Sequence, residues 1–322
     1  MSGRRYLLVT PCRDEARYAR RTLDSVLAQT EPPAEWIIVD DGSRDETPAI
    51  LEEYRARAPF IRVVRRADRG ARRVGAGVIE AFDAGLATAD LARFDYLCKL
   101  DLDLELPPGY FAGLMDRMER EPRIGTCSGK PYFFRPGTEP LQARFPLTDL
   151  SNLVSEKTGD ENSVGMTKFY RTACFRQIGG FVREVMWDGI DGHRCRQLGW
   201  IAVSWDDPEL RFVHLRPMGT SDQGFWRGRT RHGYGQWFMG TSPLYMLASA
   251  AYRMTRPPLL VGGAAMAWGY FRSMLQGAPR YPDPEFRRFL RRYQWTCLLL
   301  GKHSATEALN RRQAPQWSPQ SS

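Results

Sequence analysis

The first 130 residues alternate short apolar runs, rich in β-branched residues, with longer amphipathic stretches. This order predicts strands alternating with helices, as in an α/β protein with a largely parallel sheet. We expect strands over 6–10, 36–40, 61–65 and 96–100, with helices beginning near Asp14, after Ser43 and at Val74. Ligands of such sheets bind beyond the carboxyl ends of the strands. Polar residues that directly follow a strand are therefore the first candidates for a functional site.

A chain of 322 residues with 43% hydrophobic residues can bury a sizeable core, which excludes a disordered chain and a disulfide-stapled miniprotein. Its six cysteines are scattered, without zinc-ligand spacing. The start of the chain lacks the pattern of a signal peptide. We therefore expect free thiols and a reducing, cytoplasmic compartment.

Two aspartates, Asp101 and Asp103, follow the expected strand 96–100. Alternation along a strand puts both carboxylates on one side, where they repel each other unless they share a cation. Hard oxygen ligands suit Mg²⁺ or Mn²⁺. The alternative is a pair of solvated acids at a turn before Pro107.

Two further polar clusters follow expected strands. In 40–47, Asp40 and Asp41 precede Gly42, and an acceptor there suits a base N–H or a ribose hydroxyl; helix capping by Ser43 or Asp45 is the equal alternative. The other cluster, 10–15, places mixed charge after the opening strand. Its cysteine fits a small buried filler better than a nucleophile.

These clusters, in this order, resemble glycosyltransferase family 2, which has the GT-A fold. The resemblance rests on segments 9–15, 23–30, 39–47 and 100–103, and it extends from residue 5 to about 215. It implies an α/β architecture in which a Rossmann-like mixed sheet is flanked by helices. It also implies transfer of a sugar from a nucleotide-diphosphate sugar.

The resemblance implies a role for each matching residue. The residues bordering the nucleotide would be Thr10, Pro11, Arg13, Glu15, Asp40, Asp101 and, between the third and fourth strands, Arg72. The divalent metal, Mg²⁺ or Mn²⁺, would be held by Asp103, with Asp101 and His214 as further candidates. A packed or turn histidine is the alternative for His214.

An inverting transferase needs a general base for the acceptor hydroxyl. The resemblance places this base at Asp188, with Asp191 one helical turn away as the reserve. Trp187 stands where the family has Glu, and either stacks on an acceptor sugar or belongs to the core. Helix capping is the alternative role for Asp188. Processive synthases carry Gln-x-x-Arg-Trp here, and because 197–200 lacks the Arg, we expect single transfer.

The formal charge of +9 is unevenly distributed. Residues 211–322 carry 16 Lys and Arg but only 4 Asp and Glu. Because 223–312 combines these bases with aromatic and apolar helices too short to span a bilayer, we expect a helical extension that contacts a membrane surface peripherally. A hairpin packed on the catalytic domain (1–222) is the equal alternative, nucleic-acid binding is less favoured, and 313–322 is expected to be disordered.

The sequence thus predicts a metal-dependent, inverting glycosyltransferase on the inner face of the cell membrane. Its acceptor would be a glycan or a lipid-linked sugar in cell-surface polysaccharide synthesis. The alternative from another class is a catalytically silent sugar-nucleotide-binding or scaffolding protein, suggested by Trp187. A phosphatase using Asp101 as nucleophile is disfavoured, because three strand units precede that residue.

Overall fold

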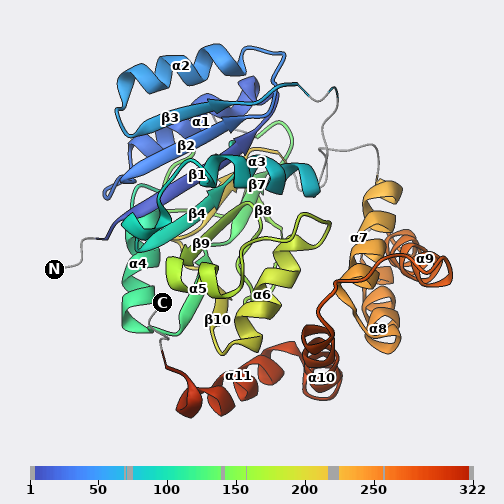
Figure 1. Ribbon diagram of the computed structural model, residues 1–322. Coiled ribbons are helices and arrows are strands. Elements are labelled where there is room, and N and C mark those ends of the chain that lie inside the picture. The colour runs from blue at the N-terminus through green and yellow to red at the C-terminus, as the bar shows by residue number, and fades with distance from the viewer. Residues whose placement is uncertain are drawn as a thin grey trace.

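The computed structural model describes residues 4–68, 70, 75–138, 142–156, 158–216, 225–256 and 258–318. Arg72, predicted to border the nucleotide, lies outside these ranges. The described chain forms a central sheet flanked by helices, followed by a group of helices at the C-terminal end (Figure 1). The predicted α/β architecture with a helical C-terminal region is confirmed.

The central sheet has seven strands in the order β10-β6-β9-β4-β1-β2-β3. They are β1 (Tyr6–Cys12), β2 (Glu35–Asp40), β3 (Ile61–Arg65), β4 (Tyr96–Leu100), β6 (Ile124–Ser128), β9 (Thr167–Arg171) and β10 (Ile201–Ser204). Strands β1 to β4 are parallel, and β9 is antiparallel to both β4 and β6. All four predicted strands are present, and β1 runs two residues beyond its predicted end.

A smaller sheet has the order β5-β11-β7-β8. Its strands are β5 (Leu104–Glu105), β7 (Pro131–Phe134), β8 (Leu153–Ser155) and β11 (Phe212–His214). Strands β7 and β8 lie in a stretch that otherwise consists largely of turns and loops. Because β5 follows Asp103 directly and pairs with β11, this sheet brings His214 beside Asp103.

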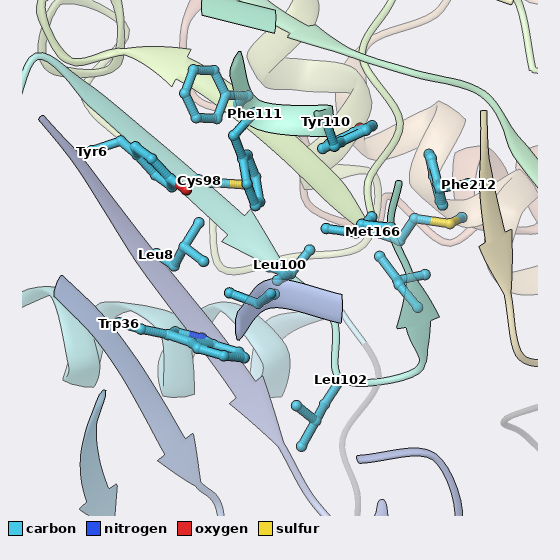
Figure 2. Packing of buried hydrophobic residues seen from close by; sticks show 14 of the residues in the cluster. Tyr6, Leu8, Trp36, Cys98, Leu100, Leu102, Tyr110, Phe111, Met166 and Phe212 are labelled. Atoms are coloured by element: carbon cyan, nitrogen blue, oxygen red, sulfur yellow. The ribbon is translucent and has the colours of Figure 1, made fainter. Parts of the chain in front are cut away.

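Helices cover both faces of the central sheet, because side chains alternate across each strand. Tyr6 and Leu8 face one side and Leu7 and Val9 the other. The first face packs on α1 (Ala16–Leu27), α2 (Thr47–Arg57) and α4 (Tyr110–Arg120), and the second on α3 (Ala76–Leu86), α5 (Thr172–Gln177) and α6 (Trp187–Gln197). Figure 2 shows the first of these layers, where Trp36, Phe111 and Met166 close around strands β1 and β4.

Five helices follow the smaller sheet: α7 (Phe225–Met239), α8 (Pro243–Met254), α9 (Val261–Leu275), α10 (Pro284–Leu300) and α11 (Lys302–Gln313). Helices α7 to α9 lie at one side of the molecule, whereas α10 and α11 run beneath α6 (Figure 1). A buried cluster that includes Ile190, Phe238 and Phe286 joins α6, α7 and α10. Across the described residues, none of the helices has the length and apolar character needed to cross a bilayer.

The tail differs from the predicted disorder of 313–322. A short 3₁₀ helix (Ala314–Gln316) follows α11, and the Trp317 ring packs edge-on against Trp200 with ring centroids 5.0 Å apart. The prediction of disorder from residue 313 is therefore wrong for 313–318. It missed that an aromatic ring close to the chain end finds a partner on the catalytic domain.

Two glycines let α7 and α9 approach closely. A Cβ built on Gly233 would lie 2.1 Å from the carbonyl oxygen of Met266, and one on Gly269 would lie 2.0 Å from that of Thr230. Real Cβ atoms do not approach a carbonyl oxygen so closely, so any side chain at these positions forces the helices apart. Gly228, in the same helix as Gly233, has open space around its Cα.

We expect Gly233→Ala to lower the free energy of unfolding by about 1–3 kcal/mol, because overpacking must shift the backbone of α9. Gly228→Ala is the matched control, and it should raise stability by up to about 1 kcal/mol through helix propensity alone. Urea denaturation of the two variants measures the difference. Equal stabilities would contradict the close packing of α7 on α9.

Candidate functional site

Hydrogen bonds link the polar clusters 10–15 and 40–47 at the carboxyl ends of β1 and β2. The backbone N–H of Asp14 donates to Ser43 Oγ (3.0 Å), and that of Glu15 donates to Thr47 Oγ1 (2.8 Å). Ser43, one of the two residues expected to cap the second helix, and Thr47 therefore hold the turn after β1. Arg13 extends the same network, donating to the Asp41 carbonyl oxygen at 3.0 Å.

A cavity of about 550 Å³ opens at this edge of the sheet. The predicted site residues that line it are Pro11, Arg13, Glu15, Asp101, Asp103, Trp187, Asp188 and His214. These come from β1, the ends of β4 and β11, and the start of α6. Segments distant in the sequence thus converge at the edge where the α/β pattern places ligands.

Three predicted residues that the structure describes do not line the cavity: Thr10, Asp40 and Asp191. Thr10 Oγ1 accepts a hydrogen bond from Trp36 Nε1, and Asp40 Oδ1 accepts one from the backbone N–H of Ser43. Both therefore shape the loops around the cavity. Their contact with a nucleotide stays a prediction.

Asp103 lies in a buried network of charges. Its Oδ2 accepts from Arg216 Nε at 2.6 Å and lies 3.5 Å from His214 Nε2, and His214 Nδ1 lies 2.8 Å from Glu156 Oε1. Burial alone would raise the pKa of Asp103, but His214 and Arg216 lower it to about 2. Burial alone would lower the pKa of His214, but Asp103 and Glu156 raise it to about 9. The network favours an ionised carboxylate facing a protonated imidazole.

The surroundings of Asp103 fit a role for this residue as one anchoring ligand of a divalent cation. Its second oxygen, Oδ1, is buried and accepts no hydrogen bond from any residue that the structure describes. A carboxylate oxygen left in this state suits Mg²⁺ or Mn²⁺. No group of three or more acidic, His or Cys side chains is arranged around a common metal position within the described ranges.

Asp101 is paired with a cation of its own. The ammonium group of Lys99, a buried residue of β4, contacts the Asp101 carboxylate and donates to the Gly165 carbonyl oxygen at 3.0 Å. Asp101 and Asp103 both reach the cavity, although the strand ends at Leu100. Each is held by a different basic side chain, Lys99 or Arg216.

Asp188 is the second residue of α6 and lines the same cavity as these aspartates. A Cβ built on Gly165 would lie 3.0 Å from Asp188 Oδ2, so the glycine leaves room for this carboxylate. Asp191 is buried instead, where it accepts hydrogen bonds from Lys168 and Tyr170. Of the two acids predicted as base, only Asp188 faces the cavity.

Trp187 lines the cavity but is mostly covered. Its ring packs edge-on against Phe181 (4.8 Å between centroids) and lies 5.2 Å from Lys99 Nζ and 5.9 Å from Lys168 Nζ. The ring therefore belongs to the core, as one of the two expectations had it, and also forms part of the cavity wall. Stacking on an acceptor sugar stays a prediction.

Sequence reasoning missed four basic residues of the site: Lys99, Lys168, Arg216 and Lys302. The two lysines in β4 and β9 did carry a signal, because a charged residue inside an apolar strand requires a buried partner. Arg216 follows the strand that ends at His214. Lys302 begins α11 and lines the cavity beside Gly159, and no local pattern marks it.

The mixed sheet, with a cavity of acidic and basic side chains at its carboxyl edge, has the architecture of a GT-A glycosyltransferase fold. A mannosyltransferase from Pyrobaculum calidifontis, solved with GDP-Man and Mn²⁺, superposes with a TM-score of 0.50 at 16% identity, over 98% of this chain and 81% of that one. GalNAc-T7, solved with UDP, GalNAc and Mn²⁺, gives a TM-score of 0.54 at 15% identity, over 89% of this chain and 56% of that one. At these identities the likeness establishes the fold alone.

Residues 7–179 match the family described as Glycosyl transferase family 2. Because this match covers more than half of the chain, the protein belongs to that family and is a glycosyltransferase. A poly-beta-1,6-N-acetyl-D-glucosamine synthase from Staphylococcus epidermidis is 28% identical over 120 residues, which are 37% of this chain and 27% of the relative. A Staphylococcus aureus (strain COL) protein of the same name is 27% identical over 131 residues, 41% of this chain and 29% of the relative. The match thus spans less than a third of these curated relatives.

Proposed function

We infer that the protein is an inverting, metal-dependent glycosyltransferase that takes its sugar from a nucleotide-diphosphate donor. The observation that carries this proposal is the cavity at the sheet edge. Asp103, which follows β4, and Asp188, at the start of α6, both line it. A donor bound between them would present its diphosphate to Asp103 and its sugar to Asp188. Arg13 and Glu15, from the turn after β1, would border the nucleotide.

In the proposed reaction, Asp188 accepts the proton of the acceptor hydroxyl as its oxygen bonds to the anomeric carbon. The bond from that carbon to the donor diphosphate breaks on the opposite face, which inverts the configuration. Asp103, with Asp101 beside it, would hold a divalent cation, and His214 would join them only after losing its proton. When bound, the cation supplies positive charge that stabilises the leaving diphosphate.

The acceptor that we propose is a growing cell-surface glycan or a lipid-linked sugar. The curated relatives named above, which match over part of their length, support a role in polysaccharide synthesis. The segment 197–200 lacks the Arg of processive synthases, which supports one sugar added per encounter.

A nucleotide-binding panel tests this proposal. We expect UDP or GDP, each with Mn²⁺ or Mg²⁺, to raise the melting temperature, because a ligand at 100 times its dissociation constant stabilises by about 2.7 kcal/mol. The same nucleotides with EDTA serve as the control and should give a smaller shift. No shift with any nucleoside diphosphate would contradict the proposal.

The C-terminal helices support peripheral contact with an anionic membrane, on the inner face of the cell membrane. Large apolar side chains are exposed on α8, α9, α10 and the connection before α9: Leu244, Leu247, Tyr252, Leu259, Leu260, Val261, Trp268, Leu275, Trp295, Leu299 and Leu300. Between Asp222 and Asp283 the chain has seven arginines and no acidic residue. Apolar side chains interspersed with bases suit the interface of an anionic bilayer.

We expect the protein to co-sediment with vesicles containing phosphatidylglycerol and to bind weakly to pure phosphatidylcholine. Leu259→Ser with Leu260→Ser should lower binding at least about 10-fold, because these leucines are 64% and 66% exposed and each loses apolar contact with lipid. Leu198→Ser, an exposed leucine after α6, is the matched control and should bind as the wild type does. Equal binding of all three proteins would show that the connection before α9 is not part of the contact surface.

A further inference from the structure

A buried lysine, which the proposed reaction does not use, contacts the backbone of the proposed base. Lys168, in β9, has a fully buried side chain, and its ammonium donates to Asp191 Oδ1 (2.7 Å) and Oδ2 (2.5 Å). The same ammonium donates to the carbonyl oxygen of Asp188 at 2.9 Å. A buried ammonium requires partners for its charge and its protons, and these two residues of α6 supply them.

The carbonyl of Asp188 receives a second hydrogen bond, from Asn162 Nδ2 at 3.1 Å. This carbonyl belongs to the second residue of α6, whose first turn follows Met186 in a left-handed conformation (φ 69°). The helix begins without a side-chain cap. Lys168 and Asn162 therefore fix the point at which the Asp188 side chain leaves the backbone.

Asp191 keeps Lys168 in place. It lies one turn further along α6 and also accepts from the Tyr170 hydroxyl and, at 2.6 Å, from the backbone N–H of Gly192. Its carboxylate is thus fixed to both α6 and β9. Asp191, the reserve candidate for the base, thus has a buried carboxylate with both oxygens in hydrogen bonds.

The Lys168 site also adjoins the donor side of the cavity. The ammonium groups of Lys168 and Lys99, which are register partners on β9 and β4, both lie near the Trp187 ring, and Lys99 contacts the Asp101 carboxylate. One covered aromatic ring therefore adjoins both the cation behind Asp188 and the cation beside Asp101. A cation can lie against an aromatic face at this distance, so the ring accommodates both.

We propose that Lys168, held by Asp191, is a positioning residue for Asp188, acting through the Asp188 carbonyl rather than on substrate. The proposal rests on the proposed function, because it takes Asp188 to be the base. A small misplacement of a reacting group costs about 10- to 100-fold in rate. Loss of the hydrogen bond should therefore lower kcat and leave donor binding unchanged.

The test compares two double variants that differ only at position 168. Lys168→Met with Asp191→Asn removes the donor to the Asp188 carbonyl, and Lys168→Gln with Asp191→Asn replaces it by an amide donor of nearly the same size. Both avoid an unpaired buried charge, and both keep an acceptor for Tyr170. Turnover is followed as nucleoside diphosphate released from UDP-GlcNAc or GDP-mannose with Mn²⁺, with a membrane lipid extract as the source of acceptor.

We expect both double variants to bind UDP or GDP with Mn²⁺ within about 2-fold of the wild type. The Met variant should lose about 10- to 100-fold in kcat at unchanged KM for the donor, and the Gln variant should recover most of that loss. Equal kcat for the two variants would overturn the proposal. A loss that appears in KM, with kcat unchanged, would do so too.

Two further variants keep the outcomes distinct. Asp188→Asn in the same assay tests the base itself: if it retains turnover, the base assignment and the positioning role both fail. If it abolishes turnover while the Met and Gln variants match the wild type, only the positioning role fails. If neither double variant folds, Asp191→Asn alone removes the charge that holds Lys168 and lies outside the cavity lining. Unchanged kcat in that variant overturns the proposal, and lowered kcat at unchanged nucleotide affinity supports it.

Discussion

Asp188→Asn is expected to lower sugar transfer by about 10²- to 10⁴-fold, the contribution of a positioned general base. The amide keeps the size of the carboxyl group and its place beside Gly165, but it cannot take the proton of the acceptor hydroxyl. The backbone of residue 188 keeps its hydrogen bonds from Lys168 and Asn162. The loss should therefore appear in kcat, with little change in the affinity for nucleoside diphosphate.

Single-turnover measurements with donor and acceptor separate these effects, and calorimetry with UDP or GDP measures binding. Asp160→Asn is the matched control, because that carboxylate is 69% exposed and pairs with Lys130 at 2.8 Å. It should retain near wild-type transfer. Transfer by Asp188→Asn at the level of this control would show that another group deprotonates the acceptor.

The second large effect is expected at Asp103, the carboxylate that we propose as the metal ligand. Asp103→Asn should abolish the Mn²⁺-dependent part of nucleotide binding and lower transfer by at least about 100-fold. The amide has one acceptor oxygen and no charge, so it is a poor ligand for a hard divalent cation. It also leaves Arg216 and His214 beside a neutral group, so some loss of stability is expected.

Calorimetric titration with Mn²⁺, with and without UDP or GDP, measures this effect directly, and EDTA treatment of the wild type should reproduce it. Asp116→Asn controls for loss of a surface carboxylate. Asp116 belongs to α4, does not line the cavity and pairs with Arg4. If Asp103→Asn binds Mn²⁺ as the wild type does, the metal site lies elsewhere.

Local sequence patterns predict the carboxyl edge of the sheet well, because the spacing of apolar residues shows where each strand and each helix begins and ends. The runs 36–39 and 96–100 are buried, as strands covered on both faces must be, and are apolar except for Lys99, and the acids that follow them reach the loops beyond. The resemblance of segments 9–15 and 39–47 to one family supplied the rest. Together, the two kinds of signal predicted Asp103 and Asp188 as site residues, and both residues line the cavity.

The partners of these acids were not predictable, because they come from distant parts of the chain. Arg216 reaches Glu15 and Asp103 from beyond β11, and Lys302 comes from the last long helix. The burial of Asp191 depends on Lys168, 23 residues earlier in the chain. Contacts of this kind are decided by tertiary packing, which no window of local sequence reports.

The position of Lys302 has a consequence for dividing this protein into modules. The family match ends at residue 179, before Asp188, Arg216 and Lys302, all of which line the cavity. Trp317 then packs on Trp200, so the tail returns to the catalytic sheet. A truncated chain limited to the matched segment would lack the proposed base and one wall of the cavity. Domain exchange between relatives must therefore move the C-terminal helices together with the sheet.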